Sequence, residues 1–170
     1  MKLYNLLKDL DYEIISGSVD IDARSVSYDS RKVKGGSVFI CIKGANADGH
    51  DYIDEAIKSG ALAIVIQEEI KIDNENITVI KVRNTKLALA SIANVFYNEP
   101  SKEINLVGVT GTNGKTTVIH YIKDILESYK KRTAIIGTLG YEFNKEKASI
   151  QKVNPTTPES VSYTHLWAGW

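Results

Sequence analysis

The sequence contains little cysteine, no excess of charge of either sign and no long apolar run. One cysteine in 170 residues cannot form an internal disulfide. The 21 basic and 21 acidic side chains cancel, so no strong overall field draws the protein to nucleic acid or to an anionic membrane. No apolar run approaches the ~20 residues of a membrane span, and the charged opening of the chain is unlike a signal peptide. These absences predict a protein of the reducing cytoplasm. Any anionic partner must then be bound by a local arrangement of donor groups rather than by the overall charge.

The residues that are present are those of a globular protein. The chain is 43% hydrophobic and 25% charged, which argues against disorder. Its single cysteine, Cys41, lies inside the apolar run 38–42. This position favours a buried and inert thiol over a nucleophile.

The first hundred residues alternate short apolar runs with helical patterns. Four leucines at helical spacing predict a short amphipathic helix at the start of the chain. Strands are expected over 25–28, 38–42, 61–66 and 77–82, and helices from 52 to Gly60 and over 87–96, where Asn84 or Thr85 is available as a cap. The alternation predicts a small α/β domain over residues 1–98.

A second unit follows the segment Asn98-Glu99-Pro100-Ser101, which ends a helix and precedes a new strand. Residues 104–110 are apolar enough for a central strand of a parallel sheet. A helix is expected over 116–129, with Ile119, Ile122, Ile125 and Leu126 on one face, and a strand over 133–136. The pattern predicts one βαβ unit in a domain that begins at residue 99 and continues to 161.

A phosphate-binding loop stands between that strand and that helix. Its sequence is Thr110-Gly111-Thr112-Asn113-Gly114-Lys115-Thr116-Thr117. Glycines allow the backbone to turn and to approach phosphate oxygens, and a helix start offers free N–H groups and a positive dipole end. Lys115 can reach the β- and γ-phosphates of ATP, and the Thr116 hydroxyl can join a Mg²⁺ shell.

The loop differs from the common P-loop because Val109 occupies the position of its first glycine. The match is to the shorter form T-G-T-x-G-K-[ST]-[ST]. A lone glycine-lysine helix start would be without function, but here the expected strand and helix flank the loop on the correct sides.

This form of the loop resembles that of the Mur ligases and the related folylpolyglutamate synthases. Two further stretches narrow the resemblance. The first runs from Asp29-Ser30-Arg31 through Gly35-Gly36 to Asp48-Gly49-His50, and it is similar to the UDP-binding domain of ligases that extend the UDP-N-acetylmuramoyl peptide. The second, Asn154-Pro155-Thr156-Thr157-Pro158-Glu159, is similar to a substrate segment of the ligase that adds the third residue, lysine or diaminopimelate.

The resemblance implies an α/β fold with a small UDP-binding domain, followed by the beginning of a parallel-sheet ATPase domain of the P-loop type. It implies an ATP- and Mg²⁺-dependent enzyme that joins an amino acid to a UDP-N-acetylmuramoyl dipeptide through an acyl phosphate, monomeric in the parent enzyme. Residues 111–117 would hold ATP, with Lys115 catalytic and Thr116 at the metal. The implied substrate-binding residues are Tyr28, Ser30, Ala45, Asn46, Ala47, Asn154, Thr156 and Thr157.

Simpler roles stay open for several of these segments. Asp29-Ser30-Arg31 also suits an ordinary polar turn, and residues 154–158 suit a rigid loop. His50 lies near two aspartates, Asp48 and Asp51, for which helix capping is favoured over metal binding. The basic run 130–132 suits a solvated helix end.

The chain is expected to be an N-terminal fragment, inactive alone, because ligases of this family are much longer. Residues 162–170, which include both tryptophans, have no recognised counterpart, and we expect a non-native tail there. Two other functions stay open. One is the sister ligase that adds D-alanyl-D-alanine, and the other is a non-catalytic nucleotide-sugar-binding remnant.

Overall fold

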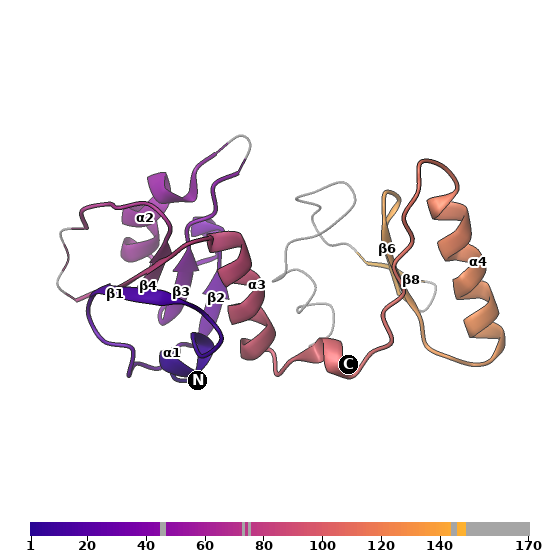
Figure 1. Cartoon of the computed structure of the whole chain (residues 1–170), viewed down its shortest axis with the longest axis horizontal. Coiled ribbons are helices and arrows are strands. Elements are labelled where there is room, and N and C mark those ends of the chain that lie inside the picture. The colour runs from indigo at the N-terminus through magenta and orange to yellow at the C-terminus, as the bar shows by residue number, and fades with distance from the viewer. Residues whose placement is uncertain (45–46, 73, 75, 144–145, 149–170) are drawn as a thin grey trace.

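A five-stranded sheet forms the first part of the computed structural model, which describes all residues except 45–46, 73, 75, 144–145 and 149–170 (Figure 1). The strands are β1 (Tyr12–Ser16), β2 (Ser25–Ser27), β3 (Ser37–Ile40), β4 (Ala61–Ile66) and β5 (Thr78–Val82). Their order is β1-β5-β4-β3-β2. Strands β2 to β5 pair in parallel, and β1 joins β5 in the antiparallel direction.

Short helices cover both faces of this sheet. The α-helices are α1 (Leu3–Leu6), α2 (Ile53–Lys58) and α3 (Thr85–Phe96), and the single-turn 3₁₀ helices are η1 (Ser30–Lys32), η2 (Gly49–Tyr52) and η3 (Pro100–Lys102). Helix α3 begins at the predicted cap, because the Asn84 side chain accepts from the N–H groups of Lys86 and Leu87. The helices and parallel strands expected from the sequence over residues 1–98 are confirmed, and no stated bound differs by more than two residues.

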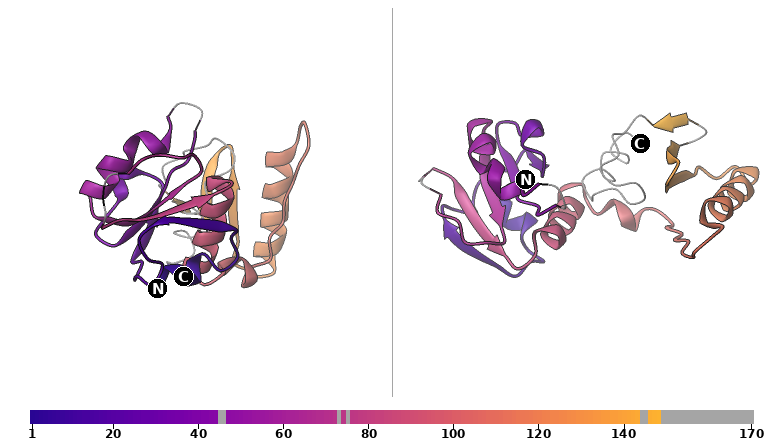
Figure 2. Two further views of the ribbon diagram at one scale, coloured as in Figure 1. Left: turned by 60° about the vertical axis from the view of Figure 1, so that its left-hand side comes forward. Right: turned by 90° about the horizontal axis from the view of Figure 1, so that it is seen from above.

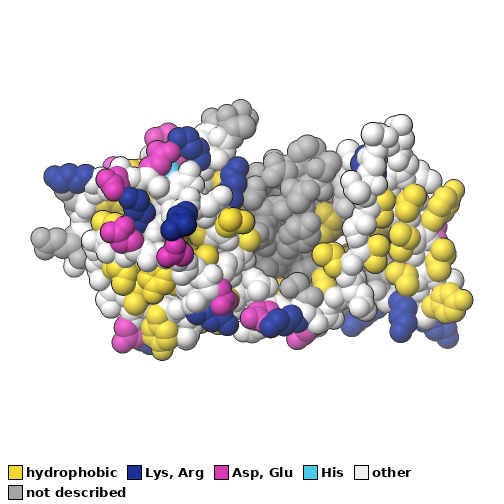
Figure 3. All heavy atoms as spheres, in the orientation of Figure 1, with side chains coloured by type: hydrophobic (Ala, Val, Ile, Leu, Met, Phe, Trp, Pro, Cys, Tyr) yellow, Lys and Arg dark blue, Asp and Glu magenta, His cyan; other side chains and the backbone are white. Residues whose placement is uncertain are grey.

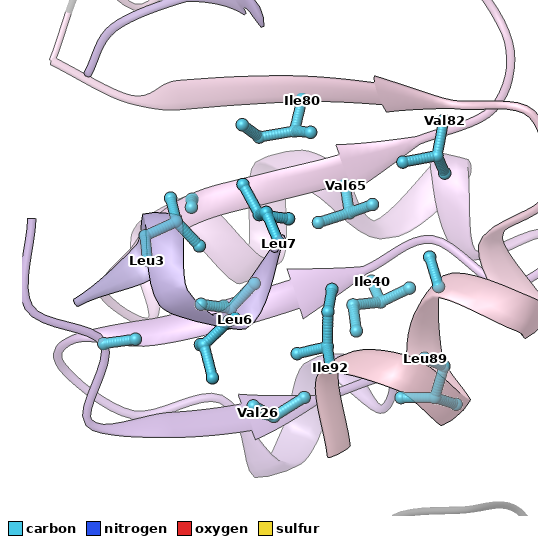
Figure 4. Packing of buried hydrophobic residues seen from close by; sticks show 14 of the residues in the cluster. Leu3, Leu6, Leu7, Val26, Ile40, Val65, Ile80, Val82, Leu89 and Ile92 are labelled. Atoms are coloured by element: carbon cyan, nitrogen blue, oxygen red, sulfur yellow. The ribbon is translucent and has the colours of Figure 1, made fainter. Parts of the chain in front are cut away.

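The core is divided by the sheet into two layers. Side chains alternate along β3, so Val38 and Ile40 enter the cluster beneath α1 and α3, whereas Phe39 enters the cluster beneath α2. Figure 4 shows the first cluster, where Leu6 of α1 and Ile92 of α3 meet the sheet. Burial on both faces explains why the central strands are almost wholly apolar.

Strand β1 is absent from the sequence-based expectations. It lies at an edge of the sheet, where Ile14 and Ile15 are both exposed in spite of pointing to opposite faces. Because Ile14 and Ile15 are adjacent, the segment lacks the alternation of apolar and polar residues that is typical of a strand. Its strand conformation comes from pairing with β5, a contact distant in sequence.

The second part contains α4 (Lys115–Ser128) and the strands β6 (Ala134–Gly137), β7 (Gly140–Phe143) and β8 (Glu146–Ala148). The three strands form an antiparallel sheet in the order β6-β7-β8. Figures 1 and 2 show α4 beside this sheet, in a lobe separate from the first sheet. No helix within the described residues is both long enough and apolar enough to cross a membrane.

The expected strand over 104–110 is not formed, and this expectation was wrong for the structure. The segment is irregular, and the Leu106 side chain is 81% exposed. Strand β6, its expected parallel neighbour, pairs instead with β7. An apolar segment becomes a strand only when neighbouring strands accept its backbone hydrogen bonds, and none does so in the described part of the chain.

One side of α4 packs on the small sheet and the other carries exposed apolar side chains. On the packed side, the buried Lys123 Nζ lies 2.7 Å from a Glu142 carboxylate oxygen. Ile125, which the spacing places on one face with Ile119 and Ile122, is 59% exposed. It belongs to a stripe that Figure 3 shows as a yellow patch over α4 and that contains Val118, Tyr121, Ile125 and Tyr129.

Two leucines of α3 test the division between core and surface. Leu89 is 1% exposed and Leu87 is 68% exposed on the same helix. We expect Leu89→Ala to lower the free energy of unfolding by about 2–5 kcal/mol, because it leaves a cavity in the core. Leu87→Ala is the matched control and should stay within ~0.5 kcal/mol of the wild type. Urea unfolding followed by circular dichroism measures both, and equal losses would contradict the packing described here.

Candidate functional site

The phosphate loop leads into α4 through a glycine in the left-handed region. Gly114 occupies the N-cap position with a φ of 76°, and no side chain caps the helix. A Cβ atom built at Gly114 would meet nothing within 4 Å, so the space beside the helix start is open. The left-handed backbone explains this glycine, since a side chain there costs about 1–2 kcal/mol.

Lys115 folds back over the loop. Its Nζ donates to the carbonyl oxygen of Gly111 at 2.5 Å and lies 3.4 Å from that of Thr112. The side chain remains exposed, so these contacts hold the ammonium near the loop without burying it. The ammonium is therefore already placed beside the loop backbone that would approach a phosphate.

The start of α4 offers donors to an anion. The first N–H groups of a helix have no intrahelical acceptor, and here the N-cap supplies none from a side chain. The half-buried Thr116 hydroxyl is part of this first turn. Backbone donors, one ammonium and one hydroxyl are the groups that a Mg²⁺-bound triphosphate requires, so the residues present fit ATP and its metal.

A second cluster of polar groups lies at the carboxyl edge of the first sheet. Strands β2 to β5 are parallel, so the turns that follow them meet at one edge, which is where open α/β sheets bind ligands. Tyr28 and Ser30 follow β2, and Ala47 lies in the loop after β3. Tyr28 is half-buried, Ser30 is buried and Ala47 is exposed.

The segment around Ser30 is a tightly bonded turn. The Asp29 carboxylate accepts from the Arg31 backbone N–H at 3.1 Å and from two guanidinium nitrogens at 2.8 Å each. The guanidinium lowers the pKa of Asp29, as does the backbone hydrogen bond, although partial burial opposes them. The structure thus shows the polar turn that the sequence allowed, and this turn fixes the position of Ser30.

Capping by Asp48 is confirmed. The Asp48 side chain accepts from the His50 N–H at the start of η2, and the described residues contain no group of His, Cys, Asp and Glu that could hold a metal. The basic residues 130–132 are exposed and follow the end of α4, as expected. Five of the predicted substrate residues lie outside the described residues: Ala45, Asn46, Asn154, Thr156 and Thr157.

Gln67 and Thr85 also lie at the sheet edge, although the sequence indicated Thr85 only as a possible helix cap and did not indicate Gln67. The Gln67 side-chain oxygen accepts from the Thr85 hydroxyl at 3.0 Å and from the Thr85 N–H at 3.3 Å. These residues follow β4 and β5, respectively. Their position after two parallel strands was the available signal, but neither residue type is specific for a site.

Cys41 is buried, as expected from its apolar neighbours. It is free of disulfides and fully inaccessible. Burial, with a smaller contribution from the negative charge of Asp48, raises the pKa of the thiol to about 12. The native thiol is therefore protonated at neutral pH and unsuited to nucleophilic chemistry.

Thiol reactivity provides a direct test of this burial. We expect the native chain to resist 5,5′-dithiobis(2-nitrobenzoate) at pH 8, because the reagent attacks an accessible thiolate. In concentrated urea the thiol should react fully within minutes. The raised pKa also affects stability. Above the ordinary thiol pKa of 9.0, the thiol ionises in the unfolded state but not in the native state, so the free energy of unfolding should fall as the pH rises. Rapid reaction in the native state would contradict the burial.

Two descriptions of one family match the chain in succession. "Mur ligase family, catalytic domain" matches residues 22–97, and "Mur ligase middle domain" matches residues 109–169. The first match covers most of the first sheet, and the second begins just before the phosphate loop. The predicted domain limits and the predicted tail over 162–170 stay predictions.

Relatives and solved structures agree with these matches. The chain is 52% identical to UDP-N-acetylmuramoyl-L-alanyl-D-glutamate--2,6-diaminopimelate ligase 2 of Clostridium acetobutylicum, over 98% of this chain and 34% of that protein. It is 44% identical to the ligase of the corresponding name from Clostridioides difficile, over 95% of this chain and 32% of that protein. The chain thus spans about a third of the length of these relatives.

A solved diaminopimelate ligase superposes with a TM-score of 0.66 over 97% of this chain and 32% of that structure, and at 21% identity it speaks for the fold alone. A MurF ligase from Thermotoga maritima in complex with ADP gives a TM-score of 0.53 at 28% identity, over 82% of this chain and 29% of that one. A mostly parallel α/β sheet, followed by a separate lobe in which a glycine-rich loop opens a helix, defines the class as an α/β protein. With the two successive matches, the chain belongs to the Mur ligase family.

Proposed function

We propose that this chain supplies the UDP-substrate-binding domain and the beginning of the ATP-binding domain of a third-residue ligase. That enzyme adds meso-diaminopimelate to UDP-N-acetylmuramoyl-L-alanyl-D-glutamate in peptidoglycan precursor synthesis. The observation that carries the proposal is the uncapped, open phosphate loop with Lys115 folded over it. The name shared by the relatives at 52% and 41% identity favours diaminopimelate over lysine.

In this proposal the phosphate loop binds Mg²⁺-ATP. The Lys115 ammonium leaves the loop carbonyls for the β- and γ-phosphates, and the N–H groups at the start of α4 hold the phosphate oxygens. Thr116 would hold the metal, which neutralises charge on the transferred phosphoryl group. The loop residues Gly111, Thr112, Asn113, Gly114 and Thr117 complete the cradle.

The sheet edge would bind the UDP-N-acetylmuramoyl dipeptide. Tyr28 and Ser30 after β2 and the loop of Ala45, Asn46 and Ala47 after β3 would meet the UDP moiety. Asn154, Thr156 and Thr157 would meet the muramoyl-peptide side. Hydroxyls and amides suit a sugar nucleotide because they donate and accept hydrogen bonds without adding net charge.

The wider setting forms part of the same proposal. Equal numbers of basic and acidic residues support a protein without nucleic-acid or membrane partners. The full-length protein is proposed to be cytoplasmic and monomeric. Because the curated relatives are about three times as long, we expect ligation from a full-length relative rather than from these 170 residues. The D-alanyl-D-alanine ligase is less favoured, since the relatives at 52% and 44% identity carry the name of the diaminopimelate ligase.

Substitution of Lys115 tests the phosphate loop. We expect Lys115→Ala to weaken Mg²⁺-ATP binding by roughly 10–100-fold, since a charge-assisted contact of about 1.5–3 kcal/mol is lost. Lys131→Ala removes an exposed lysine beyond the end of α4 and serves as the control. Isothermal titration of the 170-residue chain measures both affinities. Equal affinities of the two variants would remove Lys115 from the site.

A second titration tests the sheet edge. We expect the chain to bind UDP-N-acetylmuramoyl-L-alanyl-D-glutamate, and Lys115→Ala to leave that affinity unchanged, because the phosphate loop lies in the other lobe. Ser30→Ala should weaken binding by about 3–10-fold through the loss of one hydrogen bond. The ligand without the nucleotide, N-acetylmuramoyl dipeptide, is the control. Binding of neither ATP nor the UDP ligand would overturn the proposal for this chain.

A further inference from the structure

The loop after β3 is closed at its base by backbone contacts. Lys43 and Asp48 face each other in an isolated antiparallel bridge. Inside it, the Gly44 N–H donates to the Ala47 carbonyl oxygen at 2.9 Å. Just outside it, the Gly49 N–H donates to the Ile42 carbonyl oxygen, also at 2.9 Å. The loop therefore leaves and re-enters the sheet edge at a fixed point.

Gly49 allows the returning chain to lie directly against the end of β3. A Cβ atom at this position would lie 2.6 Å from the Ile42 nitrogen and 3.0 Å from the Cys41 Cα and carbonyl carbon. These are backbone atoms, which cannot move aside as a flexible side chain can. The close approach brings the next residue, His50, under the sheet edge, where it is 8% exposed.

The two ring nitrogens of His50 have different partners. Nδ1 lies 2.5 Å from Asp48 Oδ1, and Nε2 lies 3.4 Å from the backbone nitrogen of Gln67. A backbone N–H can only donate, so Nε2 is the acceptor, and the proton of the neutral ring lies on Nδ1 and is donated to Asp48. Asp48 Oδ1 also accepts from the His50 N–H at 3.0 Å. The ring thus joins the base of the β3 loop to the turn after β4.

The connection continues to α3. The Gln67 side chain accepts both the N–H and the hydroxyl of Thr85, the first residue of that helix. The turns after β3, β4 and β5 are therefore one hydrogen-bonded unit. His50 is the only described histidine that lies within it, and its side chain is too deeply buried to serve as a broad surface for a ligand.

We propose that His50 is a positioning residue for the nucleotide-sugar site. It acts through Asp48 and Gln67 to hold the base of the β3 loop, where Lys43 pairs with Asp48, in the conformation that receives the ligand, and it does not contact the ligand itself. The proposal rests on the proposed function in one respect, the assignment of the sugar nucleotide to this edge. The geometry of the loop stands apart from that assignment, so the two can be tested separately.

The experiment compares His50→Ala, His50→Asn and His50→Gln in the 170-residue chain, with His120→Ala on α4 as the control. The Asn amide can replace Nδ1–H as donor to Asp48, and the Gln oxygen can replace Nε2 as acceptor from Gln67. Amide hydrogen exchange of Gly44 and Gly49 reports the closed loop base, and the amides of β4 report the fold. Titration with UDP-N-acetylmuramoyl-L-alanyl-D-glutamate reports affinity.

We expect His50→Ala to accelerate exchange at Gly44 and Gly49 at least 10-fold while β4 stays protected, and to weaken ligand binding about 10-fold. Each of the two amide variants should recover part of both losses, because each retains one of the two hydrogen bonds. Nitrogen chemical shifts of the wild-type imidazole should show a protonated Nδ1 and an unprotonated Nε2.

Four results separate the possible failures. Unchanged loop exchange in His50→Ala, or the opposite tautomer, would overturn the positioning role. Faster exchange without any loss of affinity would also overturn it. If the loop opens as expected but the wild-type chain binds no UDP ligand, the loop geometry is upheld and the assignment of the ligand to this edge fails. If His50→Ala loses β4 protection, the amide variants replace it in the comparison. Faster exchange at Gly44 and Gly49 with weaker ligand binding, while β4 stays protected, supports the positioning role; wild-type exchange and affinity in both amide variants overturn it.

Discussion

Parallel pairing of β2 to β5 is the constraint on which the rest of the structure depends. Parallel strands need crossover connections, so helices must lie on the faces of the sheet. Those helices bury apolar side chains in two layers, with Val38 and Phe39 of one strand pointing into different layers. Because these four strands run in the same direction, the turns that follow them all lie at one edge of the sheet. The polar network from Asp48 to Thr85 exists at that edge because the core fixes the ends of the strands.

The second part of the chain shows the reverse case. The apolar segment 104–110 has no neighbouring strand among the described residues, and it does not form a strand. Helix α4 nevertheless forms, because helical hydrogen bonds are local and need no distant partner. The phosphate loop can therefore keep a defined helix start although the segment that precedes it, 104–110, pairs with no strand in the described part of the chain. The helix thus forms without a paired strand over 104–110, but Ile125 and the apolar residues near it on α4 stay exposed.

The sequence predicted those features that local pattern determines. Buried strands such as β4 and the cap at Asn84 could be located because apolar runs and capping residues carry their own signals. Strand β1 could not, since its conformation depends on β5, which is more than sixty residues distant in the chain. At the candidate site the loop glycines and Lys115 were identifiable from their spacing. The fold back of Lys115 onto the Gly111 carbonyl and the link from His50 to Gln67 depend on three-dimensional contacts and had no sequence signal.

The burial of Cys41 has a practical consequence. It is the only cysteine of the chain, and it lies beneath the sheet with its thiol protonated. A cysteine introduced on the surface would therefore carry nearly all of the thiol reactivity of the native protein. A fluorophore or spin label could be attached beside the β3 loop or the start of α4 without removing the natural residue. The tight packing that makes Cys41 chemically silent also makes the wild-type chain a ready background for spectroscopic probes.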